Sequence, residues 1–125
     1  MKVTEFRFKM YPKDFDKVRS FYADELQFNI IHEWNRDEQD RGTMFDVGGT
    51  TLELLTQDKP HQPVAGADLS LEIEDVWAIY EIIKDKNYLA EGLVDNAWGD
   101  TSLRIVDPEG LSISLFTKNE NRKSQ

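Results

Sequence analysis

The sequence predicts an α+β fold in which two β-α-β-β-β modules follow one another along the chain. Three observations lead to this prediction. Residues 3–10 alternate between apolar and charged side chains as a strand does, and the residues after Pro12 then change to helical spacing. The same order of strand and helix begins again near residue 68. An offset of 61 residues, as from Asp14 to Asp75, carries caps and core positions of the first half onto those of the second.

The first module is expected to span about residues 1–57, and its first strand is followed by a helix. Asp14 stands where an N-cap side chain accepts a hydrogen bond from the backbone, and apolar residues recur behind it on one helical face. These are Phe15, Val18, Tyr22 and Leu26. Further strands are expected over residues 28–34, 43–47 and 51–56. Gly48-Gly49 is suited to a tight turn between the last two.

Two polar segments interrupt the pattern. Residues 35–42 (NRDEQDRG) are charged and rich in turn formers, so we expect a solvated loop at the end of a hairpin. Residues 58–66 contain two prolines and a glycine and are expected to link the two modules.

The second module is expected to span about residues 67–117. Polar and apolar residues alternate after the linker, and Asp75 is expected to cap a helix. Its apolar face holds Val76, Ile79, Tyr80 and Ile83. Strands are expected over residues 88–94, 101–106 and 111–117, the last two joined by the turn DPEG. Residues 118–125 are expected to be a frayed tail, so that residues 1–125 form a single domain made of two modules.

Composition excludes several classes of function. The chain has 15 basic and 24 acidic residues, a net charge of −9, and no stripe of Lys or Arg, which disfavours nucleic acid as a partner. It has no cysteine, which excludes disulfides and thiolate chemistry and agrees with a cytoplasmic location. No window is apolar enough for a membrane span, and the start does not resemble a signal peptide. A neutral or cationic small molecule is the expected partner.

If the helices cover the apolar side of each sheet, the other side carries polar residues. These are Glu5, Arg7, Lys9, Glu53, Asp68, Ser70, Glu72, Arg104, Ser112 and Ser114. Two such faces turned toward each other would enclose a polar cleft, and the offset of 61 relates Arg7 to Asp68 and Glu53 to Ser114. The alternative is the ordinary solvent-facing side of an antiparallel sheet.

Three segments carry a resemblance to a known family: FYADELQFNIIHEW, the LEL of residues 52–54, and WGDTSLRIVDPEGLSISLF. Together with the paired modules they resemble the vicinal oxygen chelate superfamily over residues 3–117. This superfamily includes glyoxalase I, extradiol dioxygenases, and fosfomycin- and bleomycin-resistance proteins. The resemblance implies two modules whose curved sheets surround a cleft, and a homodimer.

Metal-dependent members of this superfamily place four ligands, usually His, Glu or Gln, on the first and last strands of each module. The matching positions here hold Arg7, Glu53, Asp68 and Ser114, and only Glu53 is a usual ligand. Phe6 or Phe8 is an alternative to Arg7, because the turn that follows is one residue longer than in many members. Neither alternative is a metal ligand.

This set of side chains disfavours a metal. A divalent ion needs three or four converging imidazole or anionic ligands, and a guanidinium repels it. We therefore expect no cofactor, with weak binding of a divalent metal by Glu53 and Asp68 as the alternative. Arg7 is expected to bridge these two carboxylates and hold them as anions without a metal. The alternative is a solvated Arg7 with no particular partner.

The aromatic residues suggest ligand contacts. Trp98 precedes a glycine in a polar segment and Trp34 ends a strand, so both are candidates for stacking on a planar or cationic ligand. Phe45, with Val47 and Leu55, is expected to form an apolar wall of the pocket or simply core. His32 and His61 match no ligand spacing and are interpreted as surface or satisfied residues.

These observations favour a metal-independent small-molecule-binding protein similar to the bleomycin-resistance branch, with a role in antibiotic resistance. It would sequester a bulky, often cationic compound in an acidic cleft. Ligand contacts are expected from Arg7, Trp34, Phe45, Glu53, Asp68, Trp98, Arg104 and Ser114. Two alternatives stay open: a metal-dependent lyase or dioxygenase with Glu53 as general base or ligand, and a regulatory or subunit-like domain with a vestigial cleft.

Overall fold

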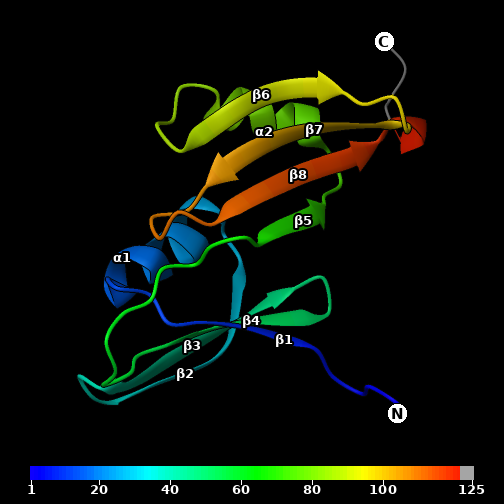
Figure 1. Ribbon diagram of the computed structural model, residues 1–125. Helices are drawn as coiled ribbons and strands as arrows, with labels where there is room; N and C mark the ends of the chain where they lie inside the picture. The colour runs from blue at the N-terminus through cyan, green and yellow to red at the C-terminus, as the bar shows by residue number, and fades with distance from the viewer. Residues whose placement is uncertain (122–125) are drawn as a thin grey trace. The chain divides into compact units, whose positions relative to one another are not determined.

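The computed structural model describes residues 1–121 and consists of two compact units, Met1–Val64 and Ala65–Gln125, here called unit 1 and unit 2. Each unit is a four-stranded mixed sheet with one α-helix between its first two strands (Figure 1). This confirms the predicted α+β class and the two β-α-β-β-β modules. None of the helices in residues 1–121 combines the length and the hydrophobicity that a membrane span requires.

Unit 1 contains β1 (Arg7–Met10), α1 (Phe15–Ser20), η1 (Phe21–Glu25), β2 (Asn29–Asp37), β3 (Asp40–Val47) and β4 (Thr50–Leu55). Its strands lie in the order β1-β4-β3-β2, with β1 parallel to β4 and the other pairs antiparallel. Tyr22 and Phe45 are fully buried at its centre, with ring centroids 6.0 Å apart. The helix and the two glycines of the β3–β4 turn form where the sequence predicts them; both glycines have positive φ.

Unit 2 contains β5 (Asp68–Glu72), α2 (Val76–Ile83), β6 (Leu89–Asp95), β7 (Asp100–Val106), β8 (Ser112–Lys118) and the 3-10 turn η2 (Asn119–Asn121). Its strand order, β5-β8-β7-β6, repeats that of unit 1. Leu103, Ile105 and Ile113 form the centre of its core.

The register of the sheets repeats with the offset that the sequence predicts. Phe8 lies opposite Leu52 in unit 1, and Leu69 lies opposite Ile113 in unit 2, so both members of the pair are displaced by 61 residues. The caps repeat as well. Asp14 accepts from the backbone N–H of Lys17 at 3.2 Å, and Asp75 accepts from that of Ala78 at 3.0 Å.

The first strand is shorter than predicted. It begins at Arg7 instead of near Val3, and Phe6 is 64% exposed. The reason is the partner strand: Arg7 lies opposite Thr51, and just before Thr51 the chain turns away through Gly48-Gly49. Only the carbonyl of Phe6 still pairs with β4, accepting from Thr51 N–H at 3.4 Å, and the ladder ends there.

The solvated loop predicted for residues 35–42 is wrong. β2 and β3 continue as a paired hairpin through Asn35 opposite Arg41 to Asp37 opposite Asp40, and only Glu38 and Gln39 form the turn. Charged residues can extend a hairpin because their side chains lie in solvent while the backbone pairs. Arg36 contributes an ion pair to Asp40 at 3.1 Å.

Two further differences concern the helix and the tail. The helix predicted to reach Leu26 is α-helical only to Ser20 and continues as a π-helical turn, which buries both Phe21 and Tyr22. In the predicted tail, Lys118 belongs to β8 and Asn119–Asn121 form η2, while residues 122–125 lie outside the described residues.

Candidate functional site

A β-bulge in β2 decides which side chains share a face with Glu53. The pairing with β3 shifts between Ile30, which lies opposite Phe45, and His32, which lies opposite Met44, and the skipped residue Ile31 is 53% exposed. Strict alternation from Ile30 would have placed His32 on the core side. The bulge instead moves His32, and with it Trp34, to the opposite face of the sheet.

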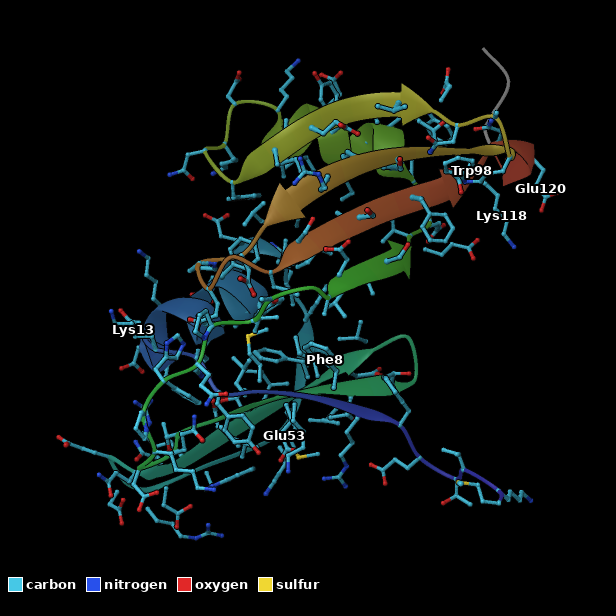
Figure 2. The ribbon with its side chains drawn as sticks, viewed as in Figure 1. Phe8, Lys13, Glu53, Trp98, Lys118 and Glu120 are labelled. Carbon is cyan, nitrogen blue, oxygen red and sulfur yellow. The ribbon has the colours of Figure 1, made fainter. Side chains whose placement is uncertain are left out.

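The side of this sheet that carries Glu53 is here called the polar face of unit 1. A row of cross-strand neighbours runs along it: Lys9 on β1, Glu53 on β4, Met44 on β3 and His32 on β2. Figure 2 shows Phe8, a neighbour of Lys9 in β1, on the other side of the sheet from Glu53. The sequence spacing predicts a surface or satisfied residue for His32, whereas the bulge that places it beside Met44 depends on pairing with β3.

Arg7 contacts Glu53 from a position on β1 that is two residues before Lys9. The register places Lys9 directly opposite Glu53 and Arg7 opposite Thr51, yet Arg7 Nη1 lies 3.7 Å from Glu53 Oε1. The Glu53 side chain is 9% exposed, while Arg7 is 44% exposed and also donates from Nε to Glu5 Oε1 at 2.5 Å. This hydrogen bond to Glu5 is the main cause that raises the pKa of Arg7 above its usual value.

The surroundings of Glu53 do not fit a divalent metal. Its nearest neighbours on the parallel strand are two cations, Arg7 and Lys9, where a metal would need further anionic or imidazole donors. Within neither unit, over residues 1–121, do three His, Asp or Glu side chains gather closely enough to hold an ion. In unit 1, the buried carboxylate of Glu53 thus lies beside the guanidinium of Arg7 and not beside further metal ligands.

Trp34 is held firmly on the polar face of unit 1. Its Nε1 donates to Asp40 Oδ1 at 3.1 Å, and its ring lies directly over the backbone of Gly42. The ring centroid of His32 is 5.4 Å away, and the guanidinium of Arg36 lies 6.0 Å from the indole centroid. Trp34 and His32 therefore form a fixed aromatic pair at the edge of the sheet.

Of the two expectations for Phe45, pocket wall or core, the structure supports the core. Its side chain is fully buried beside Tyr22 on the helix side of the sheet, opposite Leu52. Neighbouring residues in a strand point to opposite faces, so Phe45 and Glu53 do not share a surface. Phe45 is a core residue and not a wall of a pocket.

Unit 2 carries an equivalent row with different chemistry. Ser70, Ser114, Arg104 and Glu91 are successive cross-strand neighbours, here called the polar face of unit 2. Ser114 occupies the place that Glu53 has in unit 1. Asp68 lies on the same side of β5, exposed and opposite Ser112. The structure therefore brings the predicted residues Arg104 and Ser114 together.

Trp98 lies in the β6–β7 turn and is 77% exposed (Figure 2). Its Nε1 donates to Asp100 Oδ2 at 2.9 Å, and Asn96 Nδ2 donates to the other oxygen of the same carboxylate at 2.7 Å. Gly99 has a φ of 104°, which a residue with a side chain rarely adopts. The turn thus presents an indole in one orientation with most of its surface free.

The comparisons with known proteins identify relatives of the fold. A model of the glyoxalase/bleomycin resistance protein/dioxygenase superfamily matches residues 6–115. No curated protein matches the sequence. Among solved structures, a member of the same superfamily from Sphaerobacter thermophilus has a TM-score of 0.76 and 18% identity, over 94% of this chain and 99% of that one.

Two other solved structures bear names that state an activity. A lactoylglutathione lyase from Agrobacterium tumefaciens has a TM-score of 0.69 and 17% identity, over 94% of this chain and 95% of that one. TnmS3, an antibiotic binding protein from Streptomyces sp. CB03234, has a TM-score of 0.73 and 21% identity, over 94% and 98%. At these identities the similarity shows the fold alone.

Proposed function

The chain belongs to the glyoxalase/bleomycin resistance protein/dioxygenase superfamily, and from that premise we propose that it binds a bulky small molecule without a resident metal. The single observation that carries the proposal is the environment of Glu53. In metal-dependent relatives this strand position supplies a metal ligand, whereas here Arg7 lies 3.7 Å away and Lys9 lies on the neighbouring strand. The guanidinium of Arg7 beside the carboxylate balances its charge, as a metal otherwise would.

The aromatic residues supply surfaces for the ligand. Trp34 and Trp98 are both tied by their indole N–H to a carboxylate, so little side-chain entropy is lost when a ligand stacks on either ring. An exposed ring beside a carboxylate, as Trp98 is beside Asp100, attracts organic cations, and the net charge of −9 acts in the same direction. The name of TnmS3, an antibiotic binding protein, is compatible with this ligand class.

Three parts of the proposal come from the family resemblance and stay predictions. They are the closure of the polar faces of units 1 and 2 around one cleft, with Arg7 bridging Glu53 and Asp68; a homodimer; and a cytoplasmic location. A role in antibiotic resistance would follow if the ligand is an antibiotic.

Metal analysis and ligand binding test the proposal together. The purified protein is incubated with Mn²⁺, Ni²⁺ and Zn²⁺, passed through a desalting column and analysed for metal. We expect much less than one ion per chain for the wild type and a clear increase for Arg7→His, which replaces the cation with a ligand. Arg36→His, an exposed arginine on the β2–β3 hairpin, is the matched control and should bind no more metal than the wild type.

Ligand binding is measured by thermal shift and tryptophan fluorescence with a panel of antibiotics that includes bleomycin. A ligand that prefers the native state raises the melting temperature, and we expect this shift to persist in EDTA. One ion per wild-type chain, with a shift that EDTA abolishes, would support the metal-dependent lyase or dioxygenase instead. An empty protein that responds to no compound would support the regulatory or subunit-like domain.

A further inference from the structure

A hollow lies on the helix side of unit 1, and Trp34 and Asn35 of the β2–β3 hairpin also contribute to its lining. It has a volume of about 400 Å³ and is formed where α1 meets β2 and β3. The side chains that matter for its chemistry are Phe15, Asp16, Arg19, Glu33, Arg41 and Thr43. All of them belong to unit 1. Two arginines and two carboxylates face one space, and the two arginines are satisfied to different degrees.

Arg19 forms a complete ion pair. Its Nε donates to Glu33 Oε2 at 2.5 Å and its Nη2 donates to Glu33 Oε1 at 2.9 Å, so the carboxylate covers the whole side edge of the guanidinium. Thr43 Oγ1 adds a hydrogen bond to Glu33 at 2.7 Å. Such a bidentate pair has little capacity left for another anion.

Arg41 forms only half of the same arrangement. Its Nη2 donates to Asp16 Oδ1 at 2.7 Å, but Nε is buried and has no hydrogen-bond partner among residues 1–121. Nε and Nη2 lie on the same edge of a guanidinium, the edge that Arg19 offers to Glu33. A buried donor without a partner is destabilising, so this edge favours any group that fills both positions.

The guanidinium of Arg41 is fixed, whereas its present partner is loosely held. Arg41 lies over the ring of Phe15, 4.5 Å from its centroid, and its backbone N–H donates to Thr56 Oγ1 at 2.8 Å. The Asp16 side chain is 74% exposed, against 39% for Glu33, and it forms its ion pair with Arg41. Asp16 can therefore turn into solvent at small cost, since exposed ion pairs contribute little.

We propose that this hollow binds a small carboxylate, which Arg41 grips through Nε and Nη2 after Asp16 swings away. The two oxygens of a carboxylate match the two parallel N–H groups of a guanidinium edge, as Glu33 demonstrates on Arg19 in the same hollow. Asp16 acts as an internal competitor, so the wild type binds a free carboxylate only in the millimolar range.

The direct test is NMR of the arginine Nε–H signals in the wild-type chain. The signal of Arg41 is assigned from its loss in Arg41→Lys. Sodium acetate should shift this signal to saturation in the millimolar range, while the Arg19 signal moves little. Tetramethylammonium chloride at equal ionic strength should leave both unchanged. An Arg41 signal that does not respond to acetate overturns the proposal, and a stronger response to sodium phosphate than to acetate overturns the assignment to carboxylates.

Asp16→Asn tests whether Asp16 competes with a free carboxylate for Arg41. The variant should fold like the wild type, because the side chain of Asp16 is exposed. The variant should bind acetate about two- to fivefold more tightly than the wild type, the range expected when an exposed ion pair is removed. Glu25→Gln is the matched control, since it changes the charge by the same amount on an exposed residue of η1. Equal effects of the two variants would mean that only net charge matters and would overturn the role of Asp16.

Discussion

Replacing Gly42 by alanine is expected to displace the indole of Trp34. A Cβ built on Gly42 would lie 2.6 Å from Trp34 Cε2 and closer still to two other ring carbons, whereas ordinary contacts begin near 3.4 Å. The ring cannot slide freely, because its Nε1 is bound to Asp40 at 3.1 Å. Overpacking of this kind costs about 1–3 kcal/mol, and a lost hydrogen bond about 1 kcal/mol. We therefore expect Gly42→Ala to lower the free energy of unfolding by about 2 kcal/mol.

Urea unfolding followed by far-ultraviolet circular dichroism measures this loss, which corresponds to a midpoint lower by about 1 M. Gly92→Ala in β6 is the control, because its Cβ would meet Tyr80 at an ordinary 3.4 Å. The same Gly42→Ala change in a Trp34→Ala background should be nearly neutral, since the obstacle is gone. A Gly42→Ala protein as stable as the wild type, or a penalty that persists without Trp34, would refute the packing argument.

Two further predictions concern single carboxylates. Asp107 is 3% exposed and accepts from the backbone N–H groups of Glu109 and Leu111 at 2.8 and 2.9 Å, so Asp107→Ala should cost about 2–4 kcal/mol in urea unfolding. Asp107→Asn keeps an acceptor oxygen and should cost clearly less; equal losses would contradict this account. The hydrogen bond from Arg19 is the main cause that lowers the pKa of Glu33 below its usual value of 4.5. The stability from this pair is complete above pH 4.5 and is lost as the pH falls through the lower folded pKa. Wild-type protein should therefore lose more stability on acidification than Glu33→Gln, and parallel pH profiles would count against the pair.

Much of the fold follows from local pattern. Asp14 and Asp75 cap the two helices as predicted, because an N-cap needs only the next three residues of its own chain segment. The tight turn at Gly48-Gly49 likewise depends on residues that tolerate positive φ. The offset of 61 residues then relates one module to the other, and the paired registers of β1–β4 and β5–β8 confirm it.

Less of the candidate site than of the fold could be predicted from the sequence. Sequence pattern placed Arg7 and Glu53 on one face, and the structure brings them within 3.7 Å. It named Trp34 as a candidate ligand contact without assigning its face and interpreted His32 as a surface or satisfied residue, because the bulge that brings both to the polar face depends on pairing with β3. It also offered Phe45 as a pocket wall, although an aromatic residue in a central strand is equally suited to the core that it occupies.

The amino-acid sequence by itself determined the two modules, their helix caps and the side of each sheet that faces its helix, since these depend on periodicities shared by near neighbours. Only the tertiary structure decided where the ladder between β2 and β3 skips Ile31, how far that hairpin extends, and which edge of Arg41 stays unsatisfied. The bulge and the ion pair of Arg41 join residues that lie ten or more positions apart in the chain, and the hairpin extends by pairing two charged strands, each of which has the local composition of a loop. Whether such bonds form depends on the geometry of both partners. The sequence around either partner alone does not contain this information.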